Sequence, residues 1–300
     1  MLTLKKNFSA SQHLKKAFDL FVFGNFWVGL CAVAQGLLTY LLIGQRPSVS
    51  ILLILFLATF FIYNIRIVLN YSVIIKNKDL YTSSRMICVA NHVNGIRLLT
   101  YLSVVLIIPF VISIKLNSIL ALSVGALLAL AYSLPVLRMK KGGLRQIAGA
   151  KTFLISLIWA SCTVLVPILD SGVQLSYLDI VLLFTKRFIL VFCLAVIFDI
   201  RDIEADLNSG LKTIANALGP TKAKMLCYAL IIIHSLLITL YDLPLHPSIY
   251  LALVIFLLVV VWFIYRSFPK KSDYFYLFWV DGMFALQYLL ILTSIYIEKL

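Results

Sequence analysis

Long apolar segments separated by short polar breaks make up most of the sequence. A helix needs roughly 20 consecutive apolar residues to cross the hydrocarbon core of a bilayer. Runs of this length recur along the chain, and they predict about nine membrane-spanning helices. We place them at residues 18–44, 50–75, 98–115, 117–135, 147–169, 177–198, 222–241, 247–267 and 273–297. The pattern therefore predicts an all-α protein, a polytopic bundle of transmembrane helices.

Composition supports this prediction and narrows the choice of partners. The mean hydropathy is +1.03 and only 13% of residues are charged, whereas ordinary soluble domains have about 25%. The net charge of +14 would suit a nucleic-acid-binding protein. However, most basic residues lie in alternate loops on one side, and the other side has only Arg46, Lys115 and Lys299. This positive-inside pattern indicates a lipid bilayer rather than nucleic acid, with the N-terminus cytoplasmic and the C-terminus outside.

The chain is expected to form one transmembrane domain over residues 1–300, because no linker or low-complexity stretch divides it. The basic opening segment, residues 1–18, lacks the cleavage pattern of a signal peptide and predicts an interfacial helix or a solvated tail. The two most polar inner segments are residues 136–146 and 199–221. Both fall on the cytoplasmic side, so we expect them to meet at one mouth of the bundle.

Four of the 12 acidic residues gather in the segment FDIRDIEADLNSGLKTIANALG, residues 198–219. Asp199, Asp202 and Asp206 have the spacing i, i+3, i+7, which places them on one face of a helix, and Glu204 points away. Three carboxylates on one face repel each other unless a cation lies among them. Carboxylates together with phosphate oxygens favour Mg²⁺. A solvated acidic cap, partnered by Arg201 and Lys212, explains the same pattern, and the spacing leaves both interpretations open.

This segment resembles the second aspartate-rich motif of the UbiA superfamily of intramembrane prenyltransferases. The matching residues are Asp199, Asp202, Asp206, Gly210, Lys212 and Thr213. The stretch AYSLPVLRMKKGGLRQIAGAK, residues 131–151, is similar to the family's YSxPPxxLK segment, with Val136 in place of the second proline. Its matching residues are Tyr132, Ser133, Pro135, Arg138 and Lys140. The two motifs occur in the family's order along a chain of suitable length.

The resemblance implies a UbiA-like helical fold and the transfer of an isoprenoid chain from a prenyl diphosphate to a lipophilic, aromatic acceptor. In such enzymes two Mg²⁺ ions, held by two acidic motifs, bind the diphosphate. It implies that Asp199, Asp202 and Asp206 are catalytic metal ligands. It also implies that Arg138, Lys140 and Lys212 bind the diphosphate, and that Tyr132 faces the prenyl cation or the phosphate. Basic residues in a cytoplasmic loop also follow from topology alone.

The family's first motif, NDxxDxxxD, is degenerate in this chain. The aligned stretch reads FIYNIRIVLN, residues 61–70, in which Asn64 matches but Ile65 and Val68 replace aspartates. Arg66 offers a positive charge that binds phosphate in place of a metal ion, or it is a structural arginine paired with an acid. We therefore include Asn64 and Arg66 among the predicted substrate-binding residues.

A further acidic residue, Asp281, lies deep in the last predicted span. An ionisable group at membrane depth is costly and faces the interior of a bundle. We expect it to form an ion pair that holds the helices together, and a substrate contact is the alternative. Its candidate partners in other helices are Lys151, Lys186 and Arg187.

Three functions fit the sequence. The first is a UbiA-like prenyltransferase that uses Mg²⁺. The second is a degenerate family member that binds an isoprenoid without transferring it, as the altered first motif suggests. The third is a membrane transporter in which Asp281, Lys151 and Arg66 line a charged pathway, and its helices lack the paired interruptions typical of transporters.

Overall fold

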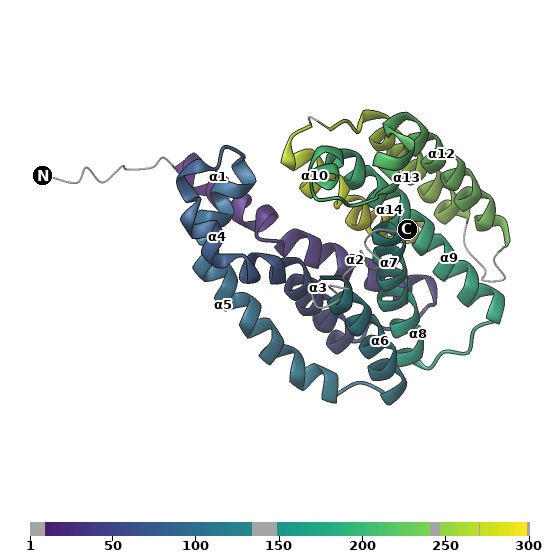
Figure 1. The fold of residues 1–300 in the computed structure, drawn as a ribbon. Helices are drawn as coiled ribbons and strands as arrows, with labels where there is room; N and C mark the ends of the chain where they lie inside the picture. The colour runs from purple at the N-terminus through teal and green to yellow at the C-terminus, as the bar shows by residue number, and fades with distance from the viewer. Residues whose placement is uncertain (1–9, 134–148, 241–246, 270, 299–300) are drawn as a thin grey trace, which may run out of the picture.

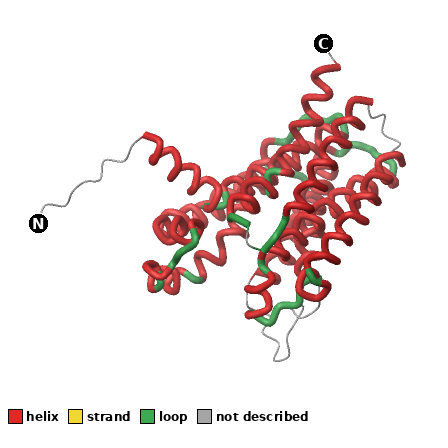
Figure 2. Tube along the Cα trace, turned by 90° about the horizontal axis from the view of Figure 1, so that it is seen from above, coloured by secondary structure: helices red, strands yellow, loops and turns green. Residues whose placement is uncertain are grey.

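The computed structural model describes residues 10–133, 149–240, 247–269 and 271–298, and all regular structure within them is helical (Figures 1 and 2). Short helical segments of other types link the helices: η1 (Lys78–Leu80) and η5 (Leu237–Leu240) are 3₁₀ turns, and η4 (Ser161–Leu165) and η6 (Phe275–Val280) are π-helical. The α-helices are α1 (Ala10–Phe23), α2 (Phe26–Leu42), α3 (Val49–Leu69), α4 (Tyr71–Lys76), α5 (Ser84–Ile112), α6 (Leu116–Ser133), α7 (Ala150–Ala160), α8 (Val166–Ser171), α9 (Tyr177–Arg201), α10 (Ile203–Asn208), α11 (Ile214–Leu218), α12 (Pro220–Leu236), α13 (Pro247–Arg266) and α14 (Met283–Glu298).

The predicted membrane-spanning helices correspond closely to those of the structure. In the described part of the chain, seven helices are long and apolar enough to cross a bilayer, and the bent pair α1–α2 makes an eighth. The remaining predicted span, 117–135, overlaps α6, and its last two residues lie outside the described residues. The sequence-based prediction of a polytopic helical bundle is therefore confirmed.

The first predicted span is broken by a bend of 59° between α1 and α2. Asn25 lies at the bend in the left-handed region, with φ 66°, a conformation that asparagine tolerates better than most residues. Its side-chain amide donates a hydrogen bond to Asn64 Oδ1 at 2.9 Å. This hydrogen bond connects the bend to α3, and the axes of α1 and α2 diverge at Asn25.

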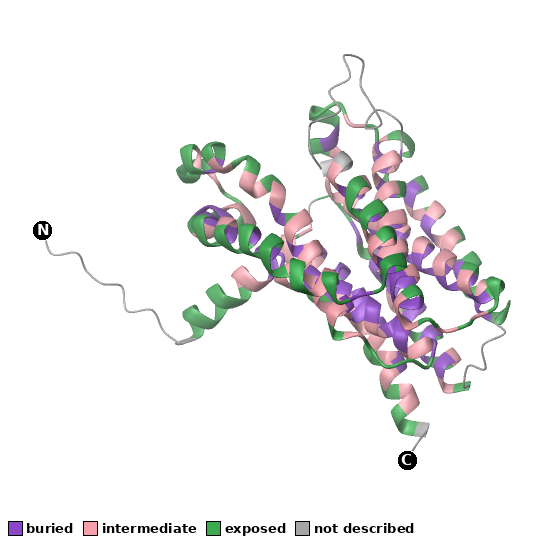
Figure 3. Cartoon of the chain, turned by 90° about the horizontal axis from the view of Figure 1, so that it is seen from below, coloured by how far each residue is buried: buried purple, intermediate pink, exposed green. Residues whose placement is uncertain are grey.

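Helix α9 forms the core of the molecule. In the most apolar 18-residue stretch of α9, 61% of the residues are buried, against 17% in the corresponding stretch of α5. Figure 1 places α3, α4 and α5 on one side of the bundle and α9, α12 and α13 on the other, with α2 and α7 between them. In Figure 3, buried positions are concentrated in the larger group of helices, where they are mixed with intermediate and exposed ones, and the helices near the N-terminus are mostly exposed or intermediate. The residues at the end of α9 are therefore held by packed neighbours.

Candidate active site

Asp199 lies near the C-terminal end of α9 and is 1% exposed. Lys151, at the start of α7, places its Nζ 2.8 Å from Asp199 Oδ1. The hydroxyl of Thr152 donates a hydrogen bond to Asp199 Oδ2 at 2.7 Å. Helices α7 and α9 pack side by side, so the carboxylate receives both bonds from a single neighbouring helix. A buried carboxylate is stable as an ion only with such partners.

The start of α7 is fixed by a glycine. Gly149 has φ +82°, a conformation that suits glycine. Its amide donates to the carbonyl of Lys212 at 3.3 Å, and a Cβ at this position would lie 3.0 Å from Ile214 Cγ1. The segment after α10 therefore lies directly against the N-terminus of α7. This close approach fixes the position along α9 of the first turn of α7, which carries Lys151.

Asp206 shares the ammonium group with Asp199. Helix α9 ends at Arg201, and α10 carries Asp206, whose Oδ2 lies 3.5 Å from Lys151 Nζ. Burial raises the pKa of Asp206, and the charges of Asp199 and Asp202 add to this effect against the opposing charge of Lys151. The two carboxylates would repel each other without the lysine between them. Glu204 is exposed, in agreement with its predicted direction.

Asp202 has a different cationic partner. It caps α9, and its Oδ1 and Oδ2 accept hydrogen bonds from Arg201 Nε at 2.7 Å and Arg201 Nη2 at 3.0 Å. Burial would raise the pKa of Asp202, but this bonding and the charges of Arg201, Lys151 and Arg85 outweigh it and lower the pKa. Asp202 is therefore held as an anion.

The guanidinium of Arg201 is positioned by two aromatic rings. It lies 4.9 Å from the ring centroid of Phe198 and 5.3 Å from that of Tyr276, both within cation–π range. Tyr276 is itself fixed, because its hydroxyl donates to the carbonyl of Phe268 at 2.6 Å and accepts from the Phe268 amide at 3.1 Å. Within the described residues, the buried Nη1 of Arg201 has no hydrogen-bond partner.

A third cation, Arg85 at the start of α5, belongs to the same cluster. It interacts electrostatically with Arg201, Asp202 and Asp281. The sequence alone did not single out this residue, because the positive-inside pattern already explains a basic residue at this end of a predicted span. We call Lys151, Arg201, Arg85, Asp199, Asp202 and Asp206 the charged cluster.

Of the other predicted site residues, the structure describes the side chains of Asn64, Arg66 and Lys212. Asn64 is completely buried and its amide is used inside the protein: Nδ2 donates to the carbonyls of Gly24 at 3.1 Å and Phe60 at 3.0 Å. Arg66 and Lys212 are exposed. Arg138 and Lys140 lie outside the described residues, as does the side chain of Tyr132. Their proposed roles in binding stay predictions.

Comparison with known proteins identifies the family. The sequence profile of the UbiA prenyltransferase family matches residues 76–282. The chain belongs to this family. No curated protein matches the sequence as a whole at a significant level.

Solved structures of UbiA proteins share the fold. A UbiA homologue from Archaeoglobus fulgidus bound to GPP and Mg²⁺ is 16% identical, and the match covers 91% of this chain and 99% of that chain with a TM-score of 0.62. The same homologue bound to DMAPP and Mg²⁺ is 16% identical over 91% and 99%, with a TM-score of 0.57. An apo UbiA homologue from Aeropyrum pernix K1 is 12% identical over 91% and 98%, with a TM-score of 0.63.

In this UbiA chain, the oxygen donors of the charged cluster do not fit a pair of Mg²⁺ ions. Among the residues that the structure describes, no three His, Cys, Asp or Glu side chains are grouped so that they would hold a metal ion. The carboxylates of Asp199 and Asp206 bind Lys151, and that of Asp202 binds Arg201. On α3 the aspartates of the first motif are replaced by apolar side chains. In this arrangement each of the three carboxylates binds a cationic side chain, and the role of Asp199, Asp202 and Asp206 as magnesium ligands stays a prediction.

The structure also corrects the expected pairing of Asp281. This residue lies between η6 and α14 and is 7% exposed. Lys151 binds Asp199 and Asp206 instead, and none of the described residues forms an ion pair with Asp281. Its charge interacts electrostatically with Arg201 and Arg85. Asp281 therefore belongs to the surroundings of the charged cluster, and it does not join distant helices.

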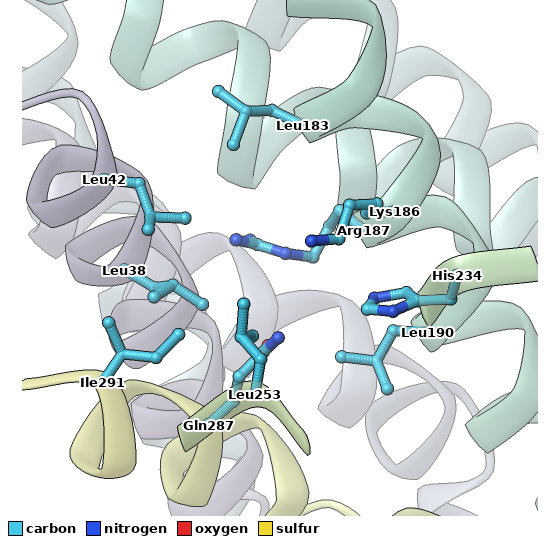
Figure 4. A pocket seen from close by; sticks show the side chains of 10 residues that line it. All are labelled: Leu38, Leu42, Leu183, Lys186, Arg187, Leu190, His234, Leu253, Gln287 and Ile291. Carbon is cyan, nitrogen blue, oxygen red and sulfur yellow. The ribbon is translucent and has the colours of Figure 1, made fainter. Parts of the chain in front are cut away.

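A polar pocket lies inside the UbiA bundle, where Lys186, Arg187, His234 and Gln287 face the same space (Figure 4). Its volume of about 30 Å³ is far too small for a prenyl diphosphate. Arg187 donates to the carbonyl of Gln35 at 3.1 Å and to Thr163 Oγ1 at 2.6 Å. We assign this pocket a structural role, because its arginine joins α2, η4 and α9.

Replacing Arg187 by methionine should lower the stability of the protein by about 2 kcal/mol, because buried acceptors on α2 and η4 lose their donor. Thermal unfolding in detergent measures the effect as a lower melting temperature. The exposed Lys222, replaced in the same way, is the control and should change little. An unchanged melting temperature in Arg187→Met would exclude the structural role.

Proposed function

We propose that this chain is a prenyltransferase that moves an isoprenoid chain from a prenyl diphosphate to a lipophilic, aromatic acceptor. Membership of the UbiA family and GPP- and DMAPP-bound structures of a similar protein support the donor class. The observation that carries the proposal is the charged cluster, which gathers three cations around the second aspartate-rich motif. A prenyl diphosphate combines a strongly anionic head, which these cations would bind, with an apolar tail that a membrane bundle would accommodate.

The cluster suits the chemistry of this transfer. When the allylic C–O bond breaks, its electron pair leaves with the diphosphate and the prenyl carbon becomes positive. Fixed cations such as Lys151 and Arg201 favour the negative charge that develops on the leaving group. A nucleophilic carbon of the acceptor then attacks the prenyl cation and afterwards loses a proton. The aromatic rings of Phe198 and Tyr276 lie beside Arg201, and a ring face also stabilises positive charge.

The orientation of the site follows the charge pattern of the sequence. We infer that the mouth formed by the end of α9 and the starts of α5 and α7 faces the cytoplasm, with the N-terminus on the same side. The whole chain, residues 1–300, would act as one transmembrane domain. The prenyl tail would extend from this mouth between the helices.

A direct assay tests the proposal. Purified protein in lipid nanodiscs is incubated with GPP or a longer prenyl diphosphate and with a panel of lipophilic phenols and quinols, and prenylated products are detected by mass spectrometry. We expect a prenylated acceptor whose formation is lost when Arg201 is replaced by glutamine. The competing function is a family member that only binds isoprenoids, which the altered first motif favours. Donor binding without any product across the panel would support that function instead.

A further inference from the structure

The position of Lys151 is that of a cation held between two carboxylates. Its Nζ lies 2.8 Å from Asp199 Oδ1 and 3.5 Å from Asp206 Oδ2. These are two of the three aspartates of the motif that the family resemblance assigns to a divalent ion. The lysine side chain is 22% exposed, so it is partly open beside the buried Asp199. An ammonium group has three donors, and it serves as a point charge for phosphate.

Arg201 is a second cation, and one of its hydrogen-bond donors is not used within the described part of the chain. Asp202 binds its Nε and Nη2, and the rings of Phe198 and Tyr276 hold the plane of the guanidinium. Its Nη1 is buried and, among the described residues, has no hydrogen-bond partner. A guanidinium presents five N–H donors in a fixed plane. The free edge is therefore oriented in advance for an anionic oxygen.

The charges around these two cations favour an anion between them. Arg85 adds a third positive charge, and its interaction with Arg201 is repulsive. Like charges that are held close together are stabilised when an anion of high charge joins them. On helix α3, Ile65 and Val68 replace the carboxylates that would make a divalent ion necessary to bind an anion.

We propose that this chain holds the donor's diphosphate directly with Lys151 and Arg201, in place of divalent metal ions. The inference rests on the proposed function, because it assigns the cations that bind the diphosphate of that reaction. This mode of diphosphate binding differs from that of a two-metal site because it requires no divalent ion. Binding would persist without Mg²⁺, and it would depend on side chains that carry the charge permanently.

The test is a titration of the full-length protein in nanodiscs with GPP, followed by intrinsic tryptophan fluorescence, in EDTA and in Mg²⁺. We expect affinities that agree within about threefold under the two conditions. Replacing Arg201 by glutamine should weaken binding in EDTA about tenfold, as the loss of one charge-assisted hydrogen bond does. Geranyl monophosphate and geraniol show how far the tail contributes, and Lys222→Gln, a change of an exposed lysine, is the matched control.

Replacing Asp202 by asparagine separates the two kinds of site without touching Lys151. If the diphosphate binds Arg201, removal of the competing carboxylate should leave its affinity in EDTA unchanged or higher. If a metal ion carries the diphosphate, the same variant should bind more weakly and only in Mg²⁺. GPP binding that requires Mg²⁺ would overturn the inference and leave the proposed function standing. Absence of GPP binding under both conditions would overturn the proposed function and the inference together.

Discussion

Replacing Lys151 by methionine is expected to lower the rate of prenyl transfer by about 10²-fold or more. The ammonium group is one of the fixed charges that meet the leaving diphosphate, and removing one such donor from a preorganised site has effects of this size. The substitution also leaves Asp199, which is 1% exposed, without its cation. A buried carboxylate that loses its partner destabilises a protein by about 3 kcal/mol. The rate is measured by product formation, and the stability by thermal unfolding in detergent.

A second variant separates these two effects. In Lys151→Met combined with Asp199→Asn, the buried charge is gone and Thr152 still has an oxygen to which it donates. We expect this double variant to recover most of the lost stability and none of the lost activity. Recovery of both would mean that Lys151 acts only on the fold. Lys151→Arg keeps the charge at a changed geometry and should retain more activity than Lys151→Met.

Restoring the family's first motif should make the protein dependent on a divalent metal. Ile65 and Val68 are three residues apart on α3, so they share a helix face, and both are partly exposed. Replacing both by aspartate places two negative charges near the diphosphate. At the effective dielectric constant of a protein surface, each added carboxylate should weaken diphosphate binding by roughly 1–2 kcal/mol. Affinity for GPP in EDTA should therefore fall about 100-fold, and Mg²⁺ should restore most of it.

The isosteric amide variant is the control for this experiment. Ile65→Asn with Val68→Asn introduces polar groups of the same size without charge, and it should change affinity little in either condition. The outcome that contradicts the account is a double aspartate variant whose affinity in EDTA equals that of the parent protein. Such a result would place Ile65 and Val68 away from the bound diphosphate.

The spans were predictable because membrane insertion depends on the length and composition of apolar runs, both of which the sequence displays directly. The bend at Asn25 was not predictable, because it lies inside such a run and depends on a hydrogen bond to Asn64 on another helix.

The acidic residues of the candidate site were predictable from the sequence, and the cationic partners that lie on other helices were not. The acidic motif is local, so its spacing revealed Asp199, Asp202 and Asp206 as a group. The partner of Asp199 and Asp206 lies on another helix, and periodicity within one helix says nothing about contacts across two. Lys151 was accordingly named as one of three candidate partners of Asp281, whereas it binds Asp199 and Asp206. Arg85 could not be distinguished from the other basic residues of its side, since topology accounts for all of them.

The most direct test of the account is an experimental structure of the protein in a lipid environment with GPP and EDTA. The account predicts density for the diphosphate within hydrogen-bond distance of Lys151 Nζ and Arg201 Nη1, with the geranyl chain extending between the helices. Diphosphate density at any other place, or density only when Mg²⁺ replaces EDTA, would contradict it.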